Sequence, residues 1–520
     1  MRERLAVWGP AALAAVLCLI SLTGRSIAFD EAATVSIVVQ NGGALGSAIA
    51  HDGGNMSGYY VLMHVLIALF GNGLFLIRLP SVISIAAAVA LTGTIALRLF
   101  DARVAFTAGL LSAVSMPLVF WGQDARGYAP MVALVAASFL SFVCLVEDER
   151  PRRGAWVAYF VTTTLAAYCG FDAILVVPAQ LVMLWWRPGA ARAVITALVC
   201  SVVCWIPLVV LAVRRGSSQL FWVPHLSLTV DKQMLEALTS AGLQPSFHAN
   251  ATMWALIVLT VLGVAAVAVV HVRRAARPAR GRRTELWGQA LVLLWLFIPV
   301  VLAFAESEFG QPIFIARNLL MCLPAVALVL AVGVCDRRLP GVLSGGALVA
   351  LLVLRLLALA PTYGVSPEDW QQATAYVIAR AQPRDCAVFY PLDARMAFEY
   401  YVARDGARSR APRSVLPVLP WGVVKPYVED YATLPAGRVP AIAASCSRLW
   451  LISSHEGQPH GPSARSRANW SEFLMLRALL ERAYRSHVRV QFSYAATIHV
   501  DLLSDGRARG APSRRRTSAR

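Results

Sequence analysis

The feature that most constrains this chain is a series of long apolar blocks. Runs such as Ala11–Leu22, Val82–Leu97 and Leu291–Phe304 approach the length of roughly 20 residues that crosses the hydrocarbon core of a bilayer. Over the 520 residues, 58% are apolar and 15% are charged. In a soluble chain, about half of the residues are apolar and about a quarter are charged. These values exclude an ordinary cytosolic enzyme and predict a polytopic α-helical membrane protein.

The blocks predict eleven transmembrane helices, and the arginines orient them. One further block, Tyr59–Phe70, has twelve residues and is too short to cross, so it predicts a helix lying in the membrane interface. With the N-terminus in the cytoplasm, most short-loop arginines then fall on the cytoplasmic side, as the positive-inside rule requires. Counting Tyr59–Phe70 as a span would place them outside. The expected spans are at about 5–23, 79–97, 104–122, 127–146, 155–171, 173–186, 191–213, 251–271, 286–304, 317–335 and 341–360.

The residues that give the net charge of +18 also lie mostly between the apolar blocks. Nearly all of it is arginine, because only Lys232 and Lys425 are lysines, and it lies between apolar blocks, as in Glu147–Arg153 and Arg273–Arg283. The charge therefore indicates the topology of a plasma-membrane protein and does not indicate nucleic-acid binding.

Composition divides the chain into three parts. Residues 1–360 hold the spans, with a long outer loop at 24–78. Residues 361–505 alternate helix-like with strand-like stretches, which predicts a small extracytoplasmic α/β domain. Residues 506–520 are basic and rich in Gly, Pro and Ser, and we expect a disordered tail. The helix-like stretches are Pro367–Ala381 and Trp470–Ser486, and the strand-like stretches are Ala387–Tyr390, Leu449–Ser453, Val488–Tyr494 and Thr497–Leu503.

Most of the nine cysteines have no chemical pattern. Seven fall in or beside apolar runs without metal-ligand spacing, which is typical of small apolar packing residues. Only Cys386 and Cys446 lie in the polar C-terminal part. They can form one disulfide if that part is outside the cytoplasm, and the sequence leaves both states open.

Two polar clusters interrupt the apolar pattern on the expected outer side. Asp30 and Glu31 follow the first span, although acids also favour the first turn of a helix. Asp124, Arg126 and Tyr128 form a polar island between the third and fourth spans. Charged residues at membrane depth are costly and tend to mark sites, with a simple turn as the alternative.

Two arginines also lie on the outer side, against the inside bias. Arg78 and Arg317 are at the outer mouths of spans, where they can reach lipid headgroups or hold a phosphate in their planar donor fork. Together with a carboxylate that takes a proton from an incoming hydroxyl, they suggest group transfer from a lipid-linked phosphate. The absence of Walker, GxSxG, HExxH and CxxC motifs argues against ATP hydrolysis and zinc proteolysis.

Four short motifs follow one another in the order Phe29-Asp30-Glu31-Ala32, Gly58-Tyr59-Tyr60, Arg78-Leu79-Pro80-Ser81 and Gln123-Asp124-Ala125-Arg126-Gly127-Tyr128. Their order and spacing resemble the family 39 type of membrane glycosyltransferase. That group includes dolichyl-phosphate-mannose protein mannosyltransferases and bacterial aminoarabinose and lipopolysaccharide-core sugar transferases. The resemblance covers about residues 25–200 and is weaker in the later spans, where Asn318 replaces the usual Tyr after Arg317.

The resemblance implies a C-type glycosyltransferase fold, an extracytoplasmic active site and a polyprenyl-phosphate sugar donor. It gives Asp30 the role of catalytic base, with Glu31 beside it, and makes Asp124 the second acidic site. Members of the family differ in their need for a divalent cation, for which Asp30 and Asp124 are the candidate ligands here. The residues implied to contact the donor phosphate or substrate are Asp124, Arg126, Tyr128, Arg317 and Arg78.

The sequence therefore predicts sugar transfer to an envelope glycan, lipid or protein, with mannose or arabinose as candidate sugars. The family's His-Pro-Pro element is absent, which argues against a protein acceptor. A transporter or flippase of a lipid-linked or anionic substrate would also explain the spans and outer charges, but it should show paired broken spans or internal repeats, and neither is found in the sequence. A non-catalytic membrane scaffold is a third possibility, and it would not need Asp30 or Asp124.

Overall fold

The computed structural model of the chain divides into two compact units. The first comprises Met1–Arg25 and Leu45–Val365, and the second comprises Ser26–Ala44 and Ser366–Arg520. The stretch Ser26–Ala44 therefore belongs with the C-terminal part, whereas composition grouped it with the spans. The expected disordered tail lies outside the described residues, as do parts of two arginine-rich segments that we expect in the cytoplasm. The structure describes residues 1–147, 153–243, 250–276, 283–493 and 496–506.

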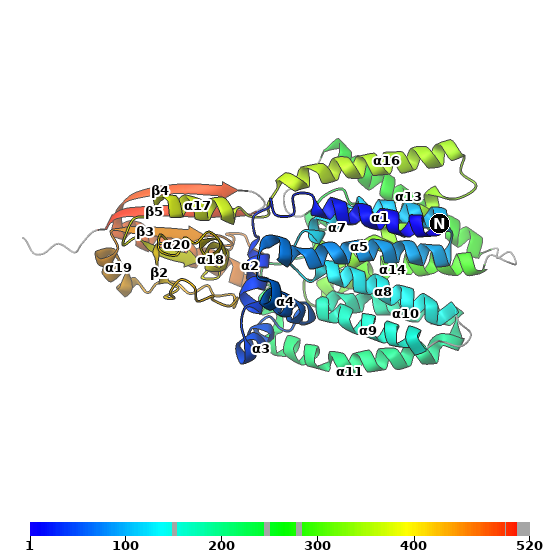
Figure 1. Cartoon of the computed structure of the whole chain (residues 1–520), viewed down its shortest axis with the longest axis horizontal. Helices are drawn as coiled ribbons and strands as arrows, with labels where there is room; N and C mark the ends of the chain where they lie inside the picture. The colour runs from blue at the N-terminus through cyan, green and yellow to red at the C-terminus, as the bar shows by residue number, and fades with distance from the viewer. Residues whose placement is uncertain (148–152, 244–249, 277–282, 494–495, 507–520) are drawn as a thin grey trace, which may run out of the picture. The chain divides into compact units, whose positions relative to one another are not determined.

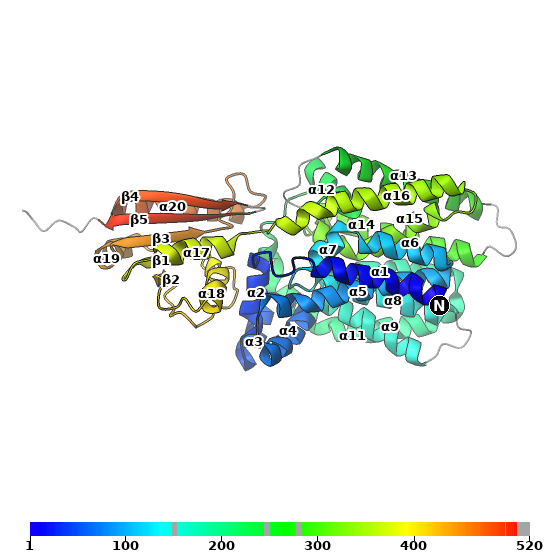
Figure 2. The ribbon, with the colours of Figure 1, turned by 45° about the horizontal axis from the view of Figure 1, so that its top comes forward.

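The first unit is a bundle in which α1, α5, α8 and α9 run alongside one another (Figures 1 and 2). Short 3-10 turns extend or join several of its helices. The α-helices are α1 (Arg2–Leu19), α4 (Ser57–Phe70), α5 (Leu74–Leu99), α6 (Ala102–Ala113), α7 (Met116–Gly122), α8 (Tyr128–Glu147), α9 (Arg153–Cys169), α10 (Val177–Met183), α11 (Ala191–Arg215), α12 (Leu228–Leu238), α13 (Ala251–Ala275), α14 (Arg283–Phe309), α15 (Leu323–Val334) and α16 (Gly341–Leu359), and α3 (Gly42–His51) crosses the division between the units. The 3-10 turns are η1 (Phe171–Val176), η2 (Leu184–Trp186), η3 (Pro188–Ala190), η4 (Gly216–Leu220), η5 (Ala316–Cys322) and η6 (Ala360–Gly364).

Among the described residues, seven helices are long and apolar enough to cross a membrane, or eight if the bent pair α6 and α7 is one span. These two helices meet at 60°, and Pro117 in the first turn of α7 cannot continue the hydrogen-bond ladder of α6. Each of the eleven predicted spans overlaps helical residues, but α1 is not among the helices that pass. Helix α9 has only 17 residues, and Phe171–Trp186 is a shorter apolar helix. The polytopic helical class is confirmed, and the count of eleven stays a prediction.

Small residues let α1 approach its neighbours closely. A Cβ atom on Gly93 of α5 would lie 3.4 Å from the Cα atom of Val7, and one on Gly109 of α6 would lie 2.8 Å from the Cβ atom of Pro10. Helices in lipid associate through such close packing because lipid tails are as apolar as the side chains. The first half of α1 is thereby held against α5 and α6.

The second unit is an α/β domain built on a five-stranded sheet of order β2-β1-β3-β5-β4. Strand β1 is parallel to β2 and β3, and β5 is antiparallel to β3 and β4. This confirms the predicted α/β domain, although β2 and α18 were not predicted and α20 ends before Tyr484, which begins β4. The elements are α2 (Phe29–Val38), α17 (Trp370–Arg380), β1 (Cys386–Tyr390), α18 (Ala394–Arg404), β2 (Arg413–Leu416), η7 (Ala436–Arg438), α19 (Val439–Ser445), β3 (Arg448–Ser453), α20 (Ala464–Ala483), β4 (Tyr484–Ser493) and β5 (Thr497–Gly506).

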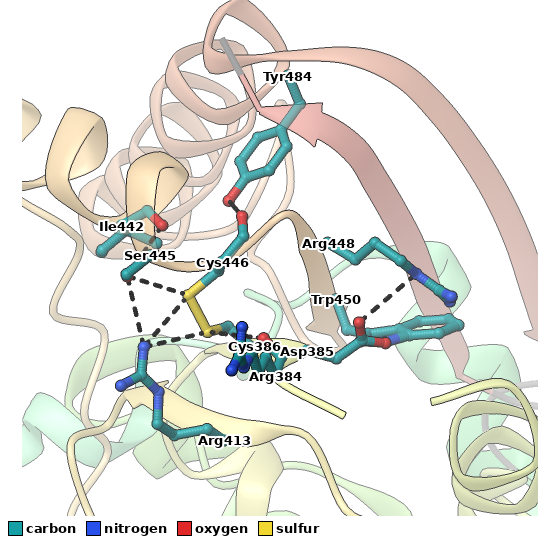
Figure 3. Close-up of a disulfide and its surroundings, with 10 residues drawn as sticks. All are labelled: Arg384, Asp385, Cys386, Arg413, Ile442, Ser445, Cys446, Arg448, Trp450 and Tyr484. Carbon is teal, nitrogen blue, oxygen red and sulfur yellow. Dashed lines mark hydrogen bonds and ion pairs between the residues drawn. A yellow bond between two sulfur atoms is a disulfide. The ribbon is translucent and has the colours of Figure 1, made fainter. Parts of the chain in front are cut away.

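A disulfide joins β1 to the end of α19 (Figure 3). It links Cys386 to Cys446, the pair that the sequence left open. Arg413 lies beside both sulfur atoms, and the Tyr484 hydroxyl donates a 3.0 Å hydrogen bond to the Cys446 carbonyl. The crosslink therefore ties β1 to the segment that leads into β3.

Candidate active site

The polar turn after α7 is held against two other helices of the first unit. Asp124 is 4% exposed, and its main-chain carbonyl accepts a 2.6 Å hydrogen bond from the Ser81 hydroxyl of α5. The Gln123 side chain donates to the carbonyls of Cys18 and Ile20 at the end of α1. The Ser81 side chain thus binds the main chain of Asp124, and the side chain of the preceding residue, Gln123, ties this turn to the end of α1.

Arg126 takes part in a chain of hydrogen bonds that the sequence did not predict. Its Nη1 atom donates to the Tyr60 hydroxyl at 3.2 Å, and that hydroxyl donates to the Asp52 carboxylate at 2.8 Å. Next to it, a Cβ atom on Gly127 would lie 2.4 Å from the Cys169 carbonyl, so only glycine fits there without a shift. Interior packing leaves no room for such an atom. The hydrogen bond to Tyr60 holds the Arg126 side chain, and the close packing at Gly127 holds the adjacent main chain.

Aromatic rings surround Arg317 in η5. Its guanidinium carbon lies 4.4 Å from the centre of the Trp222 ring and 5.8 Å from that of Tyr128, a geometry that favours a cation. Tyr128 also packs edge-on against Trp121, with ring centres 4.8 Å apart. The positive charge of Arg317 acts on the carboxyl group of Asp172 in η1. The structure therefore brings Arg317 close to Tyr128, two of the residues that the resemblance implies to contact the donor.

Arg78 has an evident structural role. The side chain is 0% exposed, and its Nη1 atom donates to the carbonyls of Leu22 and Arg25 at 2.7 and 3.1 Å. These carbonyls belong to the segment that follows α1, so Arg78 of α5 fixes the direction in which the chain leaves the bundle.

The predicted acidic pair lies in the second unit, in the first turn of α2. Glu31 is 1% exposed, and its Oε2 atom accepts a 3.0 Å hydrogen bond from the main chain of Ala28, which is the Glu half of a capping box. Asp30 is half-buried, and its carbonyl accepts a hydrogen bond from Thr34. Glu31 therefore caps the helix, which leaves Asp30 as the member of the pair suited to chemistry.

Two further residues of the second unit lie beside this turn and were missed by sequence reasoning. Glu368 is 4% exposed, accepts hydrogen bonds from the Phe29 main chain and the Trp370 indole, and lies 3.3 Å from the His455 imidazole. Burial raises the pKa of Glu368, and the charge of Asp30 adds to this rise, whereas His455 opposes it. The only signal in the sequence was the pair Glu368-Asp369 after the last span, and such a pair also fits a helix N-terminus.

Asp30 and Asp124, the two carboxylates considered for a metal ion, belong to different units. Within the described ranges, no group of three or more His, Cys, Asp or Glu side chains is arranged to hold a metal ion. A divalent cation therefore stays a prediction that the resemblance alone supports.

Known proteins resemble this chain in sequence or in fold. Residues 58–214 match the family model of the dolichyl-phosphate-mannose-protein mannosyltransferases. ArnT from Cupriavidus metallidurans bound to undecaprenyl phosphate has 12% identity and a TM-score of 0.52, over 95% of this chain and 97% of that one. The oligosaccharyltransferase AglB from Archaeoglobus fulgidus, in complex with an inhibitory peptide and a dolichol-phosphate, has 12% identity and a TM-score of 0.52, over 94% and 74%. No curated protein sequence matches the chain.

These similarities show the fold. The fold is that of the C-type membrane glycosyltransferases, as the four motifs predicted. The segment that matches the mannosyltransferase family model contains Tyr60, Arg126 and Tyr128.

Proposed function

We propose that the chain transfers a sugar from a polyprenyl-phosphate donor to an envelope acceptor on the outer face of the cytoplasmic membrane. The observation that carries this proposal is the Asp52–Tyr60–Arg126 chain of hydrogen bonds, which lies largely within the segment that matches the mannosyltransferase family. A guanidinium held in this way is prepared to bind phosphate oxygens. Mannose and arabinose remain the candidate sugars.

In the proposed reaction, Asp30 takes the proton of the acceptor hydroxyl while the acceptor oxygen forms a bond to the anomeric carbon. The bond between that carbon and the phosphate oxygen breaks, and the polyprenyl phosphate leaves with the electron pair. The configuration at the anomeric carbon is inverted. Arg126 and Arg317 hold the leaving phosphate, where fixed positive charge stabilises the negative charge that develops.

The first unit also offers a site for an isoprenoid tail. An apolar hollow of about 300 Å³ lies between α4 and α5, and its lining includes Leu66, Phe70, Leu79 and Ile83. Helix α4 carries Tyr60 as well, so one helix contributes to the phosphate contact and to the apolar hollow. A lipid phosphate has this combination of a charged head and an apolar tail. The ArnT structure that shares the fold is bound to undecaprenyl phosphate.

The disulfide supports an extracytoplasmic location for the second unit. Disulfides persist in oxidising compartments and are rare in the cytoplasm. The pair Cys386 and Cys446 lies in that unit, which also carries Asp30. We therefore place the proposed base outside the cytoplasm, with the N-terminus of α1 inside.

The test is donor turnover by the purified full chain in detergent or liposomes. We expect release of polyprenyl phosphate from a polyprenyl-phosphate mannose or arabinose, together with a labelled product of inverted configuration. Arg126→Ala should lose most of this turnover, while Arg98→Ala, which removes a surface arginine paired with Glu147, should keep it. Equal turnover by the two variants would contradict the role given to Arg126.

A further inference from the structure

The segment that leads to Asp30 is anchored by the α/β domain. The Tyr401 hydroxyl accepts a 2.8 Å hydrogen bond from the main chain of Ile27. The Ser366 hydroxyl accepts one of 2.9 Å from the main chain of Ser26, and the main chain of Gln371 donates one of 3.0 Å to the Ser26 hydroxyl. Three parts of the domain therefore fix Ser26 and Ile27, which lie two to three residues before the start of α2.

A carboxylate and an imidazole extend these contacts to the residue before Asp30. The main-chain N–H of Phe29 donates to the Glu368 carboxylate, and the Phe29 ring lies 4.7 Å from the His455 ring. Glu368 and His455 contact each other at 3.3 Å, and the Ser454 hydroxyl lies 2.8 Å from the other imidazole nitrogen. Phe29 is thus held through both its main chain and its side chain.

These groups also act on Asp30 through their charge. Glu368 is buried, and its carboxylate interacts unfavourably with that of Asp30, whereas the protonated form of His455 interacts favourably with Glu368. A negative neighbour makes an acid hold its proton more tightly. The nearby Glu31 carboxylate is turned to the Ala28 main chain, and the Trp370 indole binds Glu368.

We propose that Glu368 and His455 are positioning residues for the transfer reaction. They hold Phe29, and with it Asp30, in the orientation that catalysis needs. The α/β domain is therefore part of the catalytic apparatus and not only an envelope-binding module. This inference rests on the proposed role of Asp30 as the base.

The test compares Glu368→Gln and His455→Asn with the wild-type chain in the donor-turnover assay. Asparagine suits position 455, where φ is +56° and the left-handed conformation favours it over most residues. We expect kcat to fall about 10- to 100-fold in each variant, as for small displacements of catalytic groups, with little change in the KM for the donor. The acid limb of the kcat–pH profile should move to lower pH in Glu368→Gln, because this variant removes a negative charge that interacts with Asp30.

Two further variants keep the inference testable if a buried change disturbs folding. Tyr401→Phe removes the hydroxyl that binds Ile27 without removing a charge, so kcat should fall and the acid limb should stay in place. His487→Asn is the matched control, because it breaks another imidazole–carboxylate contact of the same domain, with Asp501, away from Phe29.

The outcomes separate this inference from the function on which it rests. If Asp30→Asn is inactive while Glu368→Gln, His455→Asn and Tyr401→Phe are folded and keep the wild-type kcat and pH profile, the positioning role is wrong and the proposed function stands. If Asp30→Asn is itself fully active, the proposed base is wrong. A loss in His487→Asn equal to that in His455→Asn would show a general effect of domain stability and would overturn the positioning role.

Discussion

The guanidinium of Arg126 and the hydroxyl of Tyr60 are joined by a 3.2 Å hydrogen bond, although the two residues lie 66 positions apart in the chain. Tyr60 belongs to α4, the short apolar helix that was predicted to lie in the membrane interface. Because the same hydroxyl donates to Asp52, its oxygen is the acceptor of the hydrogen bond from Arg126.

Tyr60→Phe should weaken donor use without unfolding the chain. The ring stays in its buried position, but Arg126 loses its hydrogen bond to the Tyr60 hydroxyl. We expect the KM for the donor to rise or kcat/KM to fall about tenfold, the loss of one hydrogen bond to a charged group. Tyr59→Phe is the matched control, since Tyr59 is an equally buried tyrosine on the same helix. Steady-state turnover at varied donor concentration measures the effect, and equal values for both variants would contradict it.

Gly127→Ala should destabilise the first unit. The added Cβ atom would lie 2.4 Å from the Cys169 carbonyl and 3.1 Å from the Met56 side chain, so main chain must move. Overpacking of this kind costs about 1–3 kcal/mol. Thermal unfolding in detergent should show a lower midpoint for Gly127→Ala than for Gly46→Ala, where no atom lies within 4 Å of the added group. Identical midpoints would show that the turn after α7 is not closely packed.

Protein taken from membranes should contain the Cys386–Cys446 disulfide. After denaturation without reductant, an alkylating reagent should label the other cysteines and spare these two. Cys386→Ser should then lower the free energy of unfolding of the α/β domain by about 2–5 kcal/mol. Full labelling of both cysteines without reductant would contradict an extracytoplasmic location.

The α/β domain should lose stability in acid through Asp501. Burial raises its pKa, but hydrogen bonds from Arg489 and His487 outweigh burial, so the pKa in the folded domain lies below the ordinary value. The stabilisation is therefore present above the unfolded pKa of about 3.9 and is lost as pH falls through the lower folded value. Asp501→Asn should cost about 1–3 kcal/mol at neutral pH. Denaturant unfolding at pH 7 and pH 3 should show a smaller difference between the two proteins at pH 3, and a constant difference would be contrary to this account.

The apolar blocks predicted the helical bundle well because a membrane span needs only length and low charge. The bend between α6 and α7 was not predicted, because the run at 104–122 has the length of one span and a proline such as Pro117 does not by itself end a helix. Helices α5 and α11 also contain prolines. Strand β2 was also missed. Its four residues form a strand only through pairing with β1, which a local pattern does not report.

The candidate site was predictable only where its residues stand in motifs. Asp30, Asp124 and Arg126 were found because charges beside spans are unusual. Glu368 and His455 were missed, since each looks like an ordinary polar residue until the fold brings it to Phe29. Arg78 was assigned to phosphate by analogy, and the structure adds contacts to the Leu22 and Arg25 carbonyls that such an analogy does not report.

The central claim is that Asp30 is the base of a sugar transfer from a polyprenyl-phosphate donor. The most direct measurement is product formation by Asp30→Asn in protein that inserts in membranes and retains its disulfide, with Glu3→Gln as a control acid at the other end of the chain's first helix. We predict a loss of kcat of at least about 100-fold for Asp30→Asn and wild-type turnover for Glu3→Gln. Full transfer by Asp30→Asn would contradict the account.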